Sequence, residues 1–267
     1  MCNLNHNLTN PIAVFDTGIG SYAIVEHIKE QFPQQDVVYL ADRNQFPYGR
    51  KSKEELTNVI RQTISYLETW EPSLIVVASN APTITVLDKV IEDFETEIIG
   101  VYPPIKEAIE VSTSKKVGVL GVQSLIESDE LSTYINREFF EESVYKFDAS
   151  ELVELVESGK FLSEKYHALM TTKKVIDGIL ETHEDIDVFT LSSTHLPWLY
   201  SYFKTLYPHI MFINPAQTVI DNIGKKVTKG NGIIKALVTT NDDYTLEEFE
   251  TMLEKLNVQL NIEEIII

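Results

Sequence analysis

The sequence has very little cysteine: its single residue of this type is Cys2, in a polar N-terminal stretch. One cysteine excludes an intrachain disulfide, a metal cluster built from cysteine ligands, and any mechanism that needs two thiols of one chain. The six histidines show neither H-x-H nor H-x-x-x-H spacing, the usual arrangement of imidazole ligands. We therefore expect no metal site.

Positive charge and long apolar runs are also scarce. Lys and Arg number 22 against 41 Asp and Glu, a formal net charge of −19. Nucleic acids and anionic membranes are bound through basic surfaces, so we expect neither as a partner, although backbone N–H groups can still hold a small anion. No apolar run approaches the roughly 18 residues that cross a bilayer. Met1–Asn7 lacks the basic and apolar regions of a secretory signal, and we expect a cytoplasmic protein.

Short β-branched runs alternate with longer amphipathic ones, which is typical of βαβ units. The strands are almost continuously apolar, which favours parallel sheets covered on both faces. We predict strands at Ile12–Asp16, Val37–Ala41, Leu74–Ser79, Ile98–Tyr102, Val117–Val122, Val144–Phe147, Val188–Ser193, Ile210–Asn214 and Ile233–Thr240. The predicted helices include Ser21–Gln31, Lys53–Thr69, Thr83–Phe94, Pro104–Val111, Tyr166–Thr182 and Leu246–Leu256.

The expected fold class is α/β, with two pseudo-symmetric domains of mainly parallel sheets flanked by helices and a ligand cleft between them. Turns rich in small polar residues recur at the strand ends, a faint internal repeat that fits two similar half-domains. We predict that residues 1–103 with 213–267 form the first domain and 104–212 the second. Ligands of open α/β sheets bind at the carboxyl ends of the strands, and a cleft between domains is a favoured place for a pocket.

Two matched turns carry the most chemistry. Ala78-Ser79-Asn80-Ala81 and Ser192-Ser193-Thr194-His195 each follow an apolar, β-branched run, and each is followed by a proline. We call Ala78–Ala81 the first corner and Ser192–His195 the second corner. Two such corners at the ends of strands suggest one site with two faces, which is the arrangement needed to move a proton from one side of a carbon to the other.

Two further turns accompany these corners. Asp16-Thr17-Gly18 closes the first strand, and its backbone N–H groups can hold an anion while Asp16 binds an amino group or assists a base. The alternative is a tight turn with Asp16 or Thr17 as helix N-cap. The G-x-G pattern lacks a third spaced glycine, so we expect no dinucleotide. Pro47-Tyr48-Gly49 forms a stiff loop that presents a phenol, or is only a loop.

Three side chains have competing interpretations. Ser193 and His195 suggest a serine hydrolase. However, two residues that are two positions apart at the end of a strand direct their side chains unfavourably for a direct hydrogen bond, and the G-x-S-x-G elbow is absent. His195 is better explained as an acid or base beside Ser193, or as a residue that caps the following helix. Glu157 has acidic neighbours, and most such carboxylates are solvated charges on a helix face.

Taken in order, the motifs resemble those of the aspartate/glutamate racemase family, and within it most closely the glutamate racemases. The resemblance covers about residues 11 to 228. Phe15–Gly20 resembles the family's F-D-S-G-x-G, and Pro47-Tyr48-Gly49 its P-Y-G. Ser79-Asn80 stands where the family has C-N-T, and Ser193-Thr194-His195 where it has C-T-H. Leu155–Gly159 is similar to the segment that carries the family's functional glutamate.

The resemblance implies a cofactor-independent amino-acid racemase, commonly dimeric, whose D-glutamate product feeds peptidoglycan synthesis. In such enzymes one cysteine thiolate removes the Cα proton and a second returns one from the opposite face. The implied catalytic positions are Ser79, Ser193, Asp16, His195 and Glu157, where Asp16 tunes the first corner and His195 with Glu157 the second. The implied substrate-binding positions are Asp16, Thr17, Pro47, Tyr48, Gly49, Asn80 and Thr194.

The sequence departs from this pattern at the thiols, because both corners carry serine. A thiol has a pKa near 8.5, whereas an alcohol is roughly five units weaker as an acid, so each alkoxide costs about 7 kcal/mol more. Ala81 stands where the family has threonine, and Val122 and Leu125 replace residues of a threonine-rich turn. These further changes favour natural divergence over an engineered pair of Cys-to-Ser changes.

The leading interpretation is a racemase-like protein with a cleft for a small amino acid or carboxylate that lacks, or nearly lacks, two-thiol racemisation. The first alternative is an active glutamate or aspartate racemase that uses Ser79, Ser193 or His195 as bases. A hydrolase of esters or amides and a purely structural role are the remaining alternatives. We expect no cofactor, and a homodimer follows from the resemblance alone.

Overall fold

The computed structural model describes residues 7–138 and 143–267. The chain forms two compact units: residues up to Val101 together with Ala216–Ile267 make the first, and Tyr102–Pro215 make the second. The predicted domain boundaries lie within a few residues of these limits, and the assignment of functional domains stays a prediction. Among the helices described here, none has the length and apolar character needed to cross a membrane.

The first unit contains a six-stranded sheet in the order β10-β9-β2-β1-β3-β4, in which every neighbouring pair runs parallel. Asp42 pairs with Thr239, and Asp16 pairs with Ala41, so β1, β2 and β9 end at one edge of the sheet. The strands are β1 (Ile12–Asp16), β2 (Val37–Asp42), β3 (Leu74–Val77), β4 (Ile98–Gly100), β9 (Ile234–Thr239) and β10 (Ile262–Glu264).

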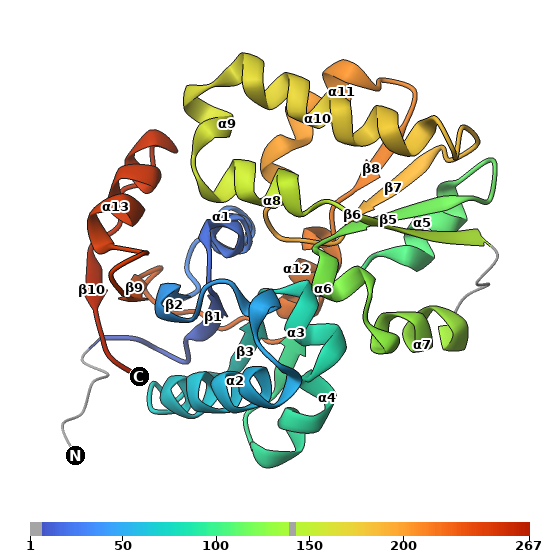
Figure 1. Cartoon of the computed structure of the whole chain (residues 1–267). Coiled ribbons are helices and arrows are strands. Elements are labelled where there is room, and N and C mark those ends of the chain that lie inside the picture. Colours follow the sequence, from blue (N-terminus) through green and yellow to red (C-terminus); the bar gives the residue numbers. More distant parts are fainter. Residues whose placement is uncertain (1–6, 139–142) are drawn as a thin grey trace. The chain divides into compact units, whose positions relative to one another are not determined.

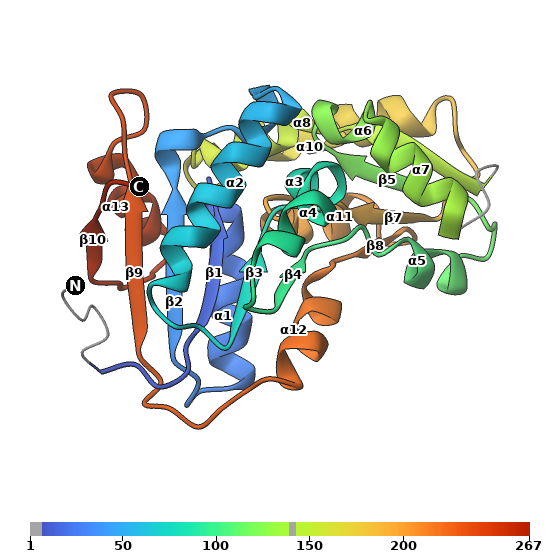
Figure 2. The ribbon, with the colours of Figure 1, turned by 90° about the horizontal axis from the view of Figure 1, so that it is seen from below.

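Helices α1 and α2 cover opposite faces of this sheet (Figures 1 and 2). The helices of the first unit are α1 (Tyr22–Gln31), α2 (Lys53–Glu68), α3 (Asn80–Thr85), α4 (Leu87–Val90), α12 (Ala216–Gly224) and α13 (Leu246–Lys255). Short 3-10 helices occur at Ile19–Ser21, Arg43–Gln45, Tyr48–Arg50 and Ile91–Asp93.

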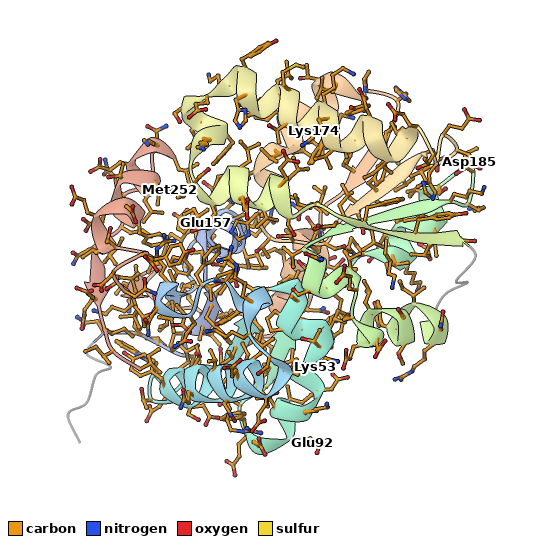
Figure 3. The ribbon with its side chains drawn as sticks, viewed as in Figure 1. Lys53, Glu92, Glu157, Lys174, Asp185 and Met252 are labelled. Atoms are coloured by element: carbon orange, nitrogen blue, oxygen red, sulfur yellow. The ribbon has the colours of Figure 1, made fainter. Side chains whose placement is uncertain are left out.

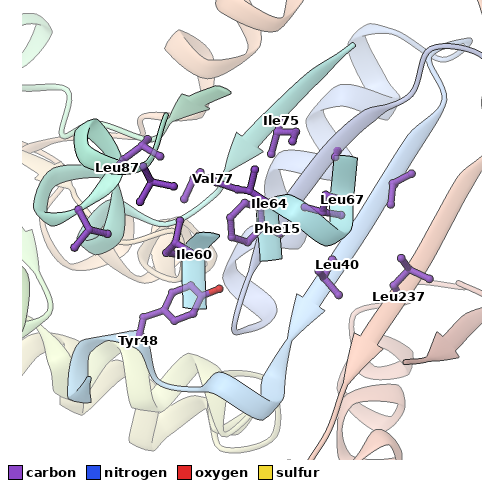
Figure 4. Packing of buried hydrophobic residues seen from close by; sticks show 14 of the residues in the cluster. Phe15, Leu40, Tyr48, Ile60, Ile64, Leu67, Ile75, Val77, Leu87 and Leu237 are labelled. Atoms are coloured by element: carbon purple, nitrogen blue, oxygen red, sulfur yellow. The ribbon is translucent and has the colours of Figure 1, made fainter. Parts of the chain in front are cut away.

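One hydrophobic core cluster of the first unit lies between α2 and the sheet (Figure 4). A capping box of Ser52 and Glu55 satisfies free backbone N–H groups at the start of α2. The helix then presents one apolar face, since its buried aliphatic side chains recur every three or four residues. They are Leu56, Ile60, Ile64 and Leu67. Each such side chain contributes about 1.5–3 kcal/mol when fully buried, which fixes α2 and the loop before it on the strands.

The second unit contains a four-stranded parallel sheet in the order β6-β5-β7-β8. Helices α5 and α10 lie on opposite faces of it (Figures 1 and 2). The strands are β5 (Val117–Gly121), β6 (Val144–Asp148), β7 (Val188–Leu191) and β8 (Met211–Ile213). The helices are α5 (Ile105–Val111), α6 (Gln123–Ile126), α7 (Asp129–Glu138), α8 (Ser150–Glu157), α9 (Lys160–Ser163), α10 (Lys165–Leu180) and α11 (Tyr200–Leu206), with a 3-10 helix at Leu196–Leu199.

The predicted fold class is confirmed as two parallel sheets flanked by helices, and each predicted strand is present with small differences at its ends. Strands β3 and β7 end two residues earlier than predicted, so Ser79 and Ser193 lie beyond the ladders. The single helix predicted at Thr83–Phe94 is wrong. Three short helical pieces replace it, because the β-branched Val86 leaves helical geometry at φ −135° and ψ −18°.

Candidate functional site

The first corner follows β3 and is held by a small hydrogen-bond network. Ser79 is extended and precedes α3, and the Thr83 hydroxyl donates to its carbonyl at 2.6 Å. The same hydroxyl accepts from the backbone N–H of Val101 at 3.1 Å. The buried Asn80 donates through Nδ2 to the Val101 carbonyl at 2.8 Å. The backbone at Ser79-Asn80 is therefore fixed by the segment that leaves β4.

Within the described structure, only one of the two polar atoms of the Asn80 amide has a hydrogen-bond partner. Its Nδ2 is bonded to Val101, whereas its Oδ1 is buried without a hydrogen-bond partner among the described residues. A buried acceptor without a partner costs about 1–3 kcal/mol. The Asn80 position therefore fits a site that supplies a donor when it is filled.

Asp16 and Thr17 lie on the strand next to this corner. Asp16 is the last residue of β1 and Thr17 follows it directly, and both side chains are buried. Phe15 pairs with Val77, and the Ala78 N–H donates to the Phe15 carbonyl at 2.8 Å, so the two turns leave neighbouring strands in register. The interpretation of Asp16 or Thr17 as N-cap is wrong, because Gly18 occupies that position and no side chain caps the helix.

Pro47-Tyr48-Gly49 does not present its phenol to solvent. The Tyr48 ring lies in the core cluster with Ile60 (Figure 4), and its hydroxyl donates to Asp42 Oδ2 at 3.5 Å. Burial raises the pKa of Tyr48 well above its ordinary value, and the carboxyls of Asp42 and Asp16 add to the shift. The loop keeps its place at the strand ends, but as part of the core rather than as an exposed arm.

Asp42, the last residue of β2, is a buried carboxyl that the sequence interpretation did not assign to the site. Its oxygens accept from Thr239 at 2.7 Å and from Thr63 at 3.2 Å, besides the longer bond from Tyr48. Burial raises the pKa of Asp42, while these hydroxyl donors oppose the shift. Its place at the carboxyl end of a strand, shortly before Pro47-Tyr48-Gly49, was the available signal.

The second corner follows β7, and all of its side chains are buried. The Ser192 N–H donates to the Leu120 carbonyl at 2.8 Å, which extends the β5–β7 pairing by one bond. Ser193 Oγ accepts from the backbone N–H of His195 at 3.4 Å. The 3-10 helix at Leu196–Leu199 then begins with Pro197 in its first turn. This turn fixes Ser193, Thr194 and His195 at the strand end.

Glu157 is the main correction to the sequence interpretation. It is the last residue of α8 (Figure 3), only 8% exposed, and its Oε2 lies 2.9 Å from His195 Nε2. It is therefore not a solvated helix-face charge. Gly159, at φ +70°, reverses the chain directly after α8 in a conformation that favours glycine. A buried carboxylate needs a partner, and His195 supplies it.

The bond to Glu157 indicates which nitrogen of the His195 ring carries the proton, and the prediction that His195 caps the following helix is wrong. No side chain caps the 3-10 helix at Leu196–Leu199. When Nε2–H donates to Glu157, the neutral imidazole carries its lone pair on Nδ1. The ring is bonded to Glu157, and Ser193 Oγ to backbone. This geometry differs from the nucleophile–base bond of a serine hydrolase.

Each unit thus brings together part of the predicted set. The first places Asp16, Thr17, Tyr48 and Asn80 at the carboxyl edge of its sheet and adds Asp42. The second joins Ser193, Thr194 and His195 to Glu157. The assignment of these residues to catalysis or binding stays a prediction.

Curated relatives of this chain are glutamate racemases. It is 32% identical over 215 residues to the glutamate racemase of Sulfurihydrogenibium sp. (strain YO3AOP1), covering 80% of this chain and 81% of the relative. It is 30% identical over 222 residues to that of Persephonella marina, covering 83% and 84%. No family model matches the chain.

Solved structures have the same fold at lower identity. Escherichia coli glutamate racemase, in complex with L-glutamate and the activator UDP-MurNAc-ala, superposes with a TM-score of 0.81 at 22% identity, covering 96% of this chain and 98% of that one. Isoform RacE1 of Bacillus anthracis gives 0.79 at 24% and covers 98% of each chain. Picrophilus torridus aspartate racemase gives 0.54 at 17%, covering 82% and 96%. Because two glutamate racemases match this chain at 30% identity or more over about four-fifths of their length, the chain belongs to the aspartate/glutamate racemase family, with glutamate racemases as its relatives.

Proposed function

We propose that this protein binds a small amino acid or carboxylate and lacks, or nearly lacks, two-thiol racemisation. One observation carries the proposal: the chain has a single cysteine, Cys2, while serine occupies both strand-end corners. An alcohol is roughly five pKa units weaker as an acid than a thiol, about 7 kcal/mol for each proton transfer through an alkoxide. We therefore expect racemisation through these two serines to be slower by several orders of magnitude.

Retained polar groups support binding. In the first unit these are the buried Asp16 and Thr17 and the Asn80 amide; in the second it is the buried Thr194. A carboxylate and amide acceptor suit an ammonium group, and hydroxyl and backbone donors suit a carboxylate. One structure of this fold, that of the Francisella tularensis glutamate racemase, is in complex with D-glutamate. An acidic amino acid is therefore the first ligand to test.

The test measures binding and turnover on the same preparation. The protein is titrated by calorimetry with both enantiomers of glutamate and of aspartate, and each enantiomer is then followed by chiral chromatography. We expect saturable binding of at least one of these amino acids without conversion to its mirror image. Racemisation at about 1–10³ per second, the range of ordinary enzymes, would contradict the proposal.

The Thr194→Val variant connects binding to the second corner. Valine keeps the shape of threonine and removes the hydroxyl, so we expect affinity to fall by about tenfold, the loss of one hydrogen bond to a charged group. Thr205→Val is the matched control, because Thr205 is exposed on α11 and its hydroxyl donates to the Ser201 carbonyl of the same helix. Equal loss in both variants would remove Thr194 from the site.

A second candidate function is an active glutamate or aspartate racemase that uses serine or histidine bases and supplies D-glutamate for peptidoglycan. The buried His195–Glu157 pair favours it, because Glu157 orients the imidazole of the turn that also carries Ser193. Appearance of solvent deuterium at Cα from both enantiomers, with inversion, would support this second function. The cytoplasmic location and the homodimer stay predictions, the latter checked by light scattering of the eluting protein.

A further inference from the structure

We infer that, among the residues described at the two corners, His195 is the base that removes a Cα proton, and that proton transfer is therefore one-sided: a bound amino acid exchanges its Cα proton with retention of configuration. The inference rests on the proposed function, because it requires the amino acid to bind. Removal and return of the Cα proton then take place at the second corner alone, and the reaction is hydrogen exchange rather than racemisation.

The geometry around His195 supports a base with a defined orientation. His195 is 5% exposed and Glu157 8%, so water competes little for their 2.9 Å bond. The bond engages Nε2, which leaves Nδ1 as the nitrogen with the free lone pair. The Ser193 Oγ bond to the backbone N–H of His195 further fixes this turn. Glu157 is a positioning residue: it holds the tautomer and stabilises the imidazolium that forms.

The first corner has no group of comparable basicity among the residues described in it. Its hydroxyls, which include those of Thr17, Ser79 and Thr83, are neutral and very weak acids. Its carboxylate is that of Asp16. By ordinary side-chain values a carboxylate is roughly 400-fold less basic than an imidazole. Asp42 is occupied by three hydroxyl donors and does not substitute.

The step balances without a further reactant. Nδ1 of His195 takes the Cα proton, the C–H bond breaks, and its electron pair delocalises into the carboxylate of the amino acid. The imidazolium exchanges its new proton with solvent and then returns a proton to the same carbon. Because one base reaches one face of Cα, the C–H bond re-forms on the face from which it was broken.

This mechanism has a stereochemical signature. In deuterium oxide, deuterium enters only the enantiomer whose Cα–H faces His195, and that enantiomer keeps its configuration. The mirror-image amino acid keeps its proton. Two-base racemisation gives the opposite result, since deuterium then appears in the inverted product from either enantiomer.

The experiment incubates the protein separately with L- and D-glutamate in deuterium oxide. Proton NMR follows the Cα signal, and chiral chromatography with mass spectrometry assigns the label to an enantiomer. We expect label in one enantiomer only, with no inversion. Label in both enantiomers, or inverted product, would overturn the inference.

Two variants with one matched control test the roles of the residues. His195→Asn removes the base, and exchange should fall by about 100-fold, the lower end of the contribution of a positioned general base. Glu157→Gln should lower exchange and shift its pH profile, because the amide no longer stabilises the imidazolium. Glu154→Gln on the same helix is the control, since Glu154 is exposed and should leave exchange unchanged. Unchanged exchange in His195→Asn would exclude His195 as the base.

Calorimetry on the same samples separates this inference from the proposed function. Absence of binding by all four acidic amino acids would contradict the proposed function. Binding without exchange at Cα would leave that function in place and overturn the one-sided mechanism. Binding with exchange in one enantiomer supports both.

Discussion

The two strand-end corners differ in electrostatics although both lie at the carboxyl ends of parallel strands. The first combines hydroxyl and amide groups with two buried carboxyls, Asp16 and Asp42, of which Asp42 is occupied by three hydroxyl donors. The second contains a histidine–carboxylate pair, His195 with Glu157. Similar topology therefore positions the two serines, while the neighbouring side chains decide which corner can accept a proton.

The largest expected effect comes from returning thiols to both corners. In Ser79→Cys/Ser193→Cys we expect glutamate racemisation to rise by several orders of magnitude, because each thiolate costs about 7 kcal/mol less than an alkoxide. Chiral chromatography measures the rate. This change would make the corners functionally alike and remove the asymmetry between them.

A thiol placed one residue away is the control for this double variant. Ser79→Cys/Ser192→Cys carries the same number of thiols, but Ser192 is buried beside Thr190, whose hydroxyl lies 2.9 Å from its own. We expect no gain in racemisation. A folded Ser79→Cys/Ser193→Cys protein that is no more active than this control would show that the serines do not occupy thiol positions.

The next effect concerns stability of the second corner. His195→Ala leaves the buried Glu157 carboxylate without its imidazole partner, and we expect the free energy of unfolding to fall by roughly 3 kcal/mol. Urea titration at neutral pH measures it. Lys174→Ala is the control: its ion pair with Glu151 lies at the surface, where loss costs about 0–1 kcal/mol. Equal losses in the two variants would contradict the burial assigned to the His195–Glu157 pair.

The smallest expected effect concerns Asp42 in the first corner and depends on pH. Burial raises its pKa in the folded protein, so the protonated form stabilises the fold below the unfolded pKa near 3.9, and this contribution is lost as pH rises through the folded pKa. Asp42→Asn removes the titration. Its unfolding free energy relative to wild type should therefore increase with pH, by at most about 1.4 kcal/mol per unit.

Thermal unfolding of both proteins between about pH 4 and pH 8 follows this difference. The side chains that face Asp42 are the hydroxyls of Tyr48, Thr63 and Thr239, and Lys51 adds a weaker charge effect. Asp88→Asn is the control, because Asp88 is exposed on α4. A pH-independent difference for Asp42→Asn would show that Asp42 keeps an ordinary pKa.

The sequence alone was sufficient for the parts of the fold that depend on local pattern. Strand β1 occupies the predicted Ile12–Asp16, because continuous apolar residues in a buried parallel strand form a clear signal. Strand β10 was missed: Ile262–Glu264 contains one apolar and two acidic residues, and it forms only by pairing with β9.

The site needed contacts that no local pattern contains. Glu157 and His195 are 38 residues apart, and Asp42 and Thr239 are 197 apart. Whether a helix carboxylate is solvated depends on what packs over it, and for Glu157 that is the turn after β7. Tyr48 shows the same dependence, since the core formed by α2 decides that its ring is buried.

Whether this protein racemises an amino acid is decided by chiral analysis of L- and D-glutamate after incubation with the folded, ligand-binding protein in deuterium oxide. We expect that neither enantiomer is converted into the other, because the chain's only cysteine is Cys2 and its corners carry serine. Rapid interconversion, with deuterium at Cα of the inverted product, would contradict it.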